Sequence, residues 1–157
     1  MIKKLDEIST LPEELYKSVS SVIETITFLS VEKPEDVKNK PAESEEYTNG
    51  SVLIKTADST YLIEVLVPHG FLETISAELT IAATGKKEIN EIIADVHLEL
   101  VNNMAGSLMR KTESLTGTFT LEIPEYAVGK LSNDKAFTKH RYIVDSKYWI
   151  SVAITKI

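Results

Sequence analysis

The sequence predicts an α+β fold in which helices pack on a mainly antiparallel sheet. Three segments, residues 11–29, 71–83 and 88–112, repeat their apolar side chains with helical spacing. Two β-rich segments, residues 51–57 and 61–67, are separated by only three residues and so predict an antiparallel hairpin. Because helices and strands do not alternate strictly along the chain, as a parallel sheet would require, the pattern favours α+β.

The first third of the chain predicts one amphipathic helix followed by a loop. Thr10 and Glu13 have the spacing of a capping box, and Pro12 suits an early helical position. Residues 32–46 contain two prolines, many charges and few apolar side chains. We therefore expect a loop or a poorly ordered edge segment there.

The middle of the chain predicts a hairpin and then two helices. Pro68 and Gly70 end the second strand of the hairpin, and Gly85 separates the helix at 71–83 from the helix at 88–112. Further on, residues 119–123 alternate apolar and polar side chains until Pro124. Residues 148–155 alternate as well and predict a last strand, which we expect to lie at an exposed edge of the sheet.

Length and composition limit the classes of function. A chain of 157 residues suits one domain, here residues 1–157. The formal charge of −7, without a basic cluster, argues against nucleic acid or an anionic membrane as a partner. No apolar run reaches ~20 residues and the first residues include acids, so we expect a cytoplasmic protein. The absence of cysteine excludes disulfides and thiol nucleophiles.

One face of the helix at 88–112 is the strongest candidate for a functional surface. At roughly 100° per residue, Asp95, Glu99, Asn102 and Gly106 fall within about 60° of each other, opposite an apolar face. Short polar groups and a glycine are unusual on a solvated helix face, so this stripe predicts a docking surface. An ordinary solvated face is the alternative.

Other chemistries have little support in the sequence. His69, His97 and His140 lack the spacing of metal ligands, and His97 projects toward the apolar face of its helix, so we expect a core histidine there. Motifs of nucleotide binding and of serine hydrolases are absent.

The same helix resembles the CheX, CheC and FliY chemotaxis phosphatases. Their helical signature is Asp or Ser, three residues, Glu, two residues and Asn, which Asp95, Glu99 and Asn102 match. Residues 21–26, 49–56 and 123–129 resemble flanking segments of the same family, and the likeness covers most of residues 15–130. Because only one copy of the signature is visible, the CheX type fits better than the CheC type.

The resemblance implies a CheC/CheX-like fold and a phosphatase for the phosphoaspartate of a CheY-like response regulator. Asn102 would position the hydrolytic water, and Glu99 would pair with the regulator's active-site lysine. Asp95, Asn103 and Gly106 would contact the partner, with Gly106 allowing close approach. The protein would carry no cofactor of its own, with Mg²⁺ on the regulator, and would form a homodimer. A non-catalytic module that binds a response regulator or a flagellar-switch component is the alternative.

Overall fold

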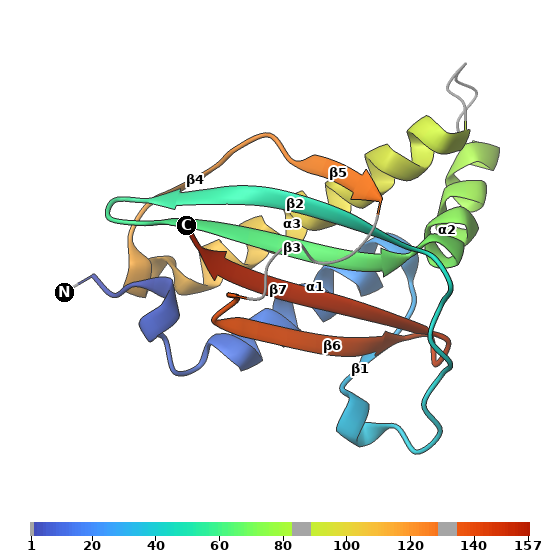
Figure 1. Cartoon of the computed structure of the whole chain (residues 1–157), viewed down its shortest axis with the longest axis horizontal. Helices are drawn as coiled ribbons and strands as arrows, with labels where there is room; N and C mark the ends of the chain where they lie inside the picture. The colour runs from blue at the N-terminus through green and yellow to red at the C-terminus, as the bar shows by residue number, and fades with distance from the viewer. Residues whose placement is uncertain (1, 83–88, 129–134) are drawn as a thin grey trace.

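Three helices pack on a seven-stranded antiparallel sheet in the computed structural model, which describes residues 2–82, 89–128 and 135–157. The helices α1 (Leu11–Thr27) and α3 (Ile89–Thr116) cover one face of the sheet, and α2 (His69–Ala82) lies at one end (Figure 1). The predicted α+β class is therefore confirmed. None of the helices in the described ranges is long and apolar enough to cross a membrane.

Helix α1 forms where its apolar spacing predicts it. Leu15, Val19 and Ile23 are buried against the sheet, and Pro12 occupies the first turn. The predicted capping box is wrong, because Thr10 has φ −89° and ψ 5° and its side chain makes no capping hydrogen bond. The helix ends at Thr27 and is followed by Phe28 with a left-handed φ of 61°, so α1 is two residues shorter than predicted.

The predicted loop at 32–46 contains little regular structure but is held to the sheet. Strand β1 (Val31–Glu32) and the 3₁₀ turn η2 (Pro34–Asp36) open it, much as the 3₁₀ turn η1 (Leu5–Glu7) precedes α1. Further on, the indole nitrogen of Trp149 donates to the carbonyl of Pro41 at 2.8 Å, and Arg141 forms a two-pronged ion pair with Glu43. These contacts fix a segment that composition alone indicates is irregular.

The predicted hairpin forms, and both of its strands lie inside the sheet. Strands β2 (Tyr47–Thr56) and β3 (Thr60–Pro68) pair antiparallel from one end to the other. Strand β2 begins four residues earlier and ends one residue earlier than predicted, and β3 is one residue longer at each end. Strands β4 (Phe119–Leu121) and β5 (Glu125–Val128) both pair with β2 on its other side. Pro124 separates β4 from β5, and β5 was not predicted.

The last strand, β7 (Tyr148–Lys156), forms as predicted but does not lie at an edge. It is paired on one side with β3 and on the other with β6 (Thr138–Val144), in the order β1-β6-β7-β3-β2-β4. The expectation of an exposed C-terminal edge is therefore wrong. Strand β6 was not predicted, and the turn that joins it to β7 has positive φ at Asp145 and Ser146 without a glycine to signal it.

Candidate functional site

The long helix α3 carries the predicted stripe. Asp95, Glu99 and Asn102 are all exposed, whereas residues on the opposite side of the helix are buried. The buried hydrophobic residues of α3 are Ile93, Val96, Leu100, Val101, Met104, Ala105, Leu108 and Met109. The helix therefore presents two carboxylates and one carboxamide outward on a rigid, core-packed element.

Gly106 is not part of the open stripe. It is buried, and a Cβ atom at this position would lie 3.0 Å from Nη1 of Arg110, one turn further along α3. The expectation of a bare approach surface at Gly106 is thus wrong, because the guanidinium of Arg110 lies over it. A partner could reach the glycine only after this flexible side chain moves.

Asn103 faces a different direction from its neighbour Asn102. It is half-buried and lines a groove between α1 and α3 with a volume of about 220 Å³. Ser21 and Thr25 of α1 form the opposite wall, and Arg110 lies on the α3 side. The two adjacent asparagines thus serve separate surfaces, one outward and one toward α1.

His97 fixes how α3 sits on the sheet. It is fully buried, with its Nε2 2.9 Å from the carbonyl oxygen of Val65 and its Nδ1 3.0 Å from the hydroxyl of Thr48. Because the carbonyl can only accept, Nε2 carries the proton and the Thr48 hydroxyl donates to Nδ1. Burial lowers the pKa of His97 to about 4, so the ring is neutral at neutral pH. The prediction of a core histidine is confirmed.

Gly50 of β2 lets α3 approach the sheet at this point. A Cβ atom there would lie 2.7 Å from Cγ2 of Val101 and 2.8 Å from Cδ2 of His97. A glycine inside a strand commonly marks such a close approach. This role of Gly50 was not predicted, and the available signal was a glycine directly before the β-rich run at 51–57. Together, Gly50 and His97 set the rotation of α3 and so direct Glu99 and Asn102 outward.

The side chains on this surface can bind a cation and can orient a small polar molecule through hydrogen bonds. Glu99 offers a carboxylate to a cation, and Asn102 offers both a carbonyl acceptor and NH₂ donors. Within the described ranges, no group of three or more histidine, aspartate or glutamate side chains is arranged to hold a metal ion.

No family sequence model and no curated sequence matches this chain. Solved structures, in contrast, match it over nearly its full length. The chemotaxis protein CheX from Vibrio vulnificus is 15% identical, with 93% of this chain and 97% of that chain covered and a TM-score of 0.68. CheX in the CheX–CheY–BeF₃–Mg²⁺ complex from Borrelia burgdorferi is 16% identical, with 93% and 97% covered and a TM-score of 0.69.

FliY from Thermotoga maritima is similar as well. It is 16% identical, with 99% of this chain and 92% of that chain covered and a TM-score of 0.60. At such identities the likeness concerns the fold, and it agrees with the resemblance found in the sequence. The fold of this chain is that of the CheX and CheC-like chemotaxis proteins.

Proposed function

We propose that this protein is a phosphatase for the phosphoaspartate of a CheY-like response regulator. The observation that carries the proposal is the outward display of Glu99 and Asn102 on a core-packed helix of a CheX-like fold. A CheX protein of this fold has been crystallised with CheY, BeF₃ and Mg²⁺. The matched signature residues and the shared fold thus point to the same class of partner.

In the proposed reaction, water attacks the phosphorus of the acyl phosphate and releases inorganic phosphate and the free aspartate. Asn102 orients that water through its carboxamide, which lowers the barrier by positioning rather than by strong base catalysis. Glu99 pairs with the regulator's active-site lysine in a charge-assisted contact. Mg²⁺ is supplied by the regulator, and this chain contributes no cofactor.

The rest of the contact with the regulator surrounds these two residues. Asp95 lies about one turn before Glu99 and contributes a contact at the rim. Asn103 extends the contact surface toward the groove beside α1. Gly106 contributes only if Arg110 swings away when the partner docks.

A non-catalytic module that captures a response regulator or a flagellar-switch component is the second candidate. The groove beside Asn103 favours it, because a groove adds contact area without adding chemistry. Single-turnover loss of phosphate from a phosphorylated regulator separates the two functions. Acceleration by a stoichiometric amount of this protein supports the phosphatase, whereas binding that leaves the rate unchanged supports the capture module.

We also propose that residues 1–157 form one CheX-like domain and that this domain forms a homodimer. The C-terminal strand cannot provide the dimer edge, since β7 is paired on both sides. The strands available for an edge contact in the described part of the sheet are β1 on one side and β4 with β5 on the other. Sedimentation at twice the 17.5 kDa chain mass is the expected result, and a 17.5 kDa species at high concentration would contradict it.

A further inference from the structure

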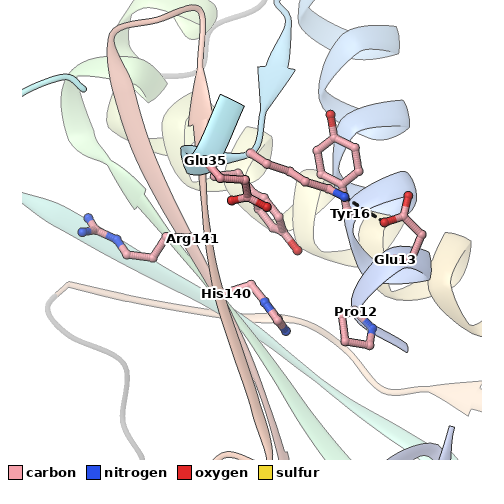
Figure 2. A pocket seen from close by; sticks show the side chains of 8 residues that line it. Pro12, Glu13, Tyr16, Glu35, His140 and Arg141 are labelled. Carbon is pink, nitrogen blue, oxygen red and sulfur yellow. Dashed lines mark hydrogen bonds and ion pairs between the residues drawn. The ribbon is translucent and has the colours of Figure 1, made fainter. Parts of the chain in front are cut away.

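A second polar cavity lies away from α3, between the first turns of α1, the 3₁₀ turn η2 and strand β6 (Figure 2). Its volume is about 190 Å³. The groups that matter in it are the carboxylates of Glu13 and Glu35, the ammonium of Lys33, and the rings of Tyr16, His140 and Tyr142. These residues come from three separate parts of the chain, so the cavity exists only in the folded protein.

Tyr142 supplies an unused hydrogen-bonding group at the wall of this cavity. Its side chain is 4% exposed, and its hydroxyl has no hydrogen-bond partner among the described residues. Burial raises the pKa of Tyr142, so the group stays a neutral phenol that can both donate and accept. Tyr16 differs, because its hydroxyl already donates to the carbonyl of Val31 at 2.9 Å.

The ring of Tyr142 is held firmly in place. Its centroid lies 5.6 Å from that of Tyr16 and 6.4 Å from that of His140, with the histidine ring nearly parallel to it. A ring packed in this way cannot swing its hydroxyl to a partner elsewhere in the protein, so the group can be satisfied only by a molecule that comes to it. A buried polar group without a partner costs about 1–3 kcal/mol, so it is a strong site for a ligand that satisfies it.

The charges in the cavity leave one carboxylate in excess. Lys33 is paired with Glu13 at 2.8 Å, and its ammonium lies 4.8 Å from the centroid of the Tyr16 ring. Glu35 has no ion pair within the described part of the chain. Arg141 also lines the cavity, but the charge of its guanidinium is balanced by Glu43, to which it is bound, and its side chain points away from Tyr16 (Figure 2).

We propose that this cavity binds a small organic cation, namely an alkylammonium or alkylguanidinium compound. Glu35 pairs with the charge, and the hydroxyl oxygen of Tyr142 accepts one N–H once the side chains beside it shift to uncover it. The hydrocarbon part packs against the edge of the Tyr16 ring, whose face Lys33 covers. Lys33 already shows that this wall accommodates a cation over an aromatic face. The volume is below the range of about 300–1,000 Å³ for drug-sized ligands, so a compound of a few carbons fits.

The test is a titration of the full chain with n-butylammonium, n-butylguanidinium and, as the charge control, n-butyrate. We expect saturable shifts of the Tyr142 and His140 ring signals in NMR spectra with both cations and no saturable shifts with butyrate. No saturation with either cation, or equal binding of butyrate, would overturn the proposal.

Two variants locate the ligand. Glu35→Gln removes the unpaired charge, and we expect binding at least about tenfold weaker, because a charge-assisted contact is lost. The matched control is Glu45→Gln, which removes an exposed carboxylate that does not line the cavity. Equal affinities of these two variants would overturn the assignment of Glu35.

Tyr142→Phe removes only the hydroxyl. Because that group is buried without a partner in the folded chain, we expect thermal unfolding at the same or a higher temperature and severalfold weaker cation binding. A folded Tyr142→Phe protein with the affinity of the original chain would overturn the role of the hydroxyl. Neither variant alters α3, so these results are independent of the proposed phosphatase.

Discussion

Replacement of Gly50 by alanine tests how closely α3 is packed on the sheet. The added Cβ would lie 2.7 Å from Cγ2 of Val101, 2.8 Å from Cδ2 of His97 and 2.9 Å from Nε2 of the same ring. All three distances are shorter than side chains tolerate, and both neighbours are buried. The histidine cannot easily move, since both of its nitrogens are hydrogen-bonded.

The magnitude follows from these contacts. Overpacking a core costs about 1–3 kcal/mol, and we expect a loss at the upper end of that range because the ring is fixed on both sides. The control is Gly70→Ala at the start of α2, where a Cβ would meet nothing within 4 Å. Alanine is the better helix former, so this control should be neutral or stabilising by up to about 1 kcal/mol.

Urea unfolding followed by far-UV circular dichroism measures both variants against the original chain. We expect a lower midpoint for Gly50→Ala with little change of slope. A loss of less than about 0.5 kcal/mol of unfolding free energy in Gly50→Ala, or unfolding together with Gly70→Ala, would refute the close packing of α3 at this point.

Three further predictions follow from the structure. The folded pKa of His97 lies near 4, below its ordinary value of 6.5, so its stabilising contribution is complete above pH 6.5 and is lost as the pH falls toward 4. The free energy of unfolding should fall by about 3 kcal/mol between pH 6.5 and pH 4, and this fall should be absent in a folded His97→Gln variant. The same dependence of unfolding free energy on pH in both proteins would contradict this prediction. Gly106→Leu should fold, displace Arg110 and weaken regulator binding in a pull-down or calorimetric titration, whereas unchanged affinity would reduce the glycine to a packing role. The ion pair with Arg141 lowers the pKa of Glu43 to about 2, but the pair is half-exposed, so Glu43→Gln should lower the free energy of unfolding by less than about 1 kcal/mol. The same variant should shift the fluorescence of Trp149. An unchanged spectrum would show that the loop at 32–46 is held without this ion pair.

The parts of the fold that the sequence predicts are those with a local pattern. The helix α3 and the β2–β3 hairpin repeat their apolar residues at regular spacing, and both formed where predicted, with ends that differ from the predicted limits by up to four residues. Strand β6 was missed because its polar residues, among them His140 and Arg141, interrupt the alternation. The central place of β7 depends on pairing with β3, more than 80 residues earlier in the chain, which no local pattern encodes.

In the candidate site, too, some features follow from local spacing and others do not. The outward positions of Asp95, Glu99 and Asn102 follow from helical spacing, since exposure repeats with the period of the helix. The cover over Gly106 depends on the side-chain conformation of Arg110, which spacing does not determine. The cavity around Tyr142 joins residues from α1, η2 and β6, so only the folded chain reveals it.

The most direct test of the proposed function compares the rate and the affinity of Asn102→Ala. The control is Asn90→Ala, an exposed asparagine at the start of the same helix. We expect Asn102→Ala to lose most of the acceleration of phosphate release from a phosphorylated regulator, while its affinity for the BeF₃-activated regulator stays close to that of the control. Phosphate release by Asn102→Ala at the same rate as by Asn90→Ala would contradict the account.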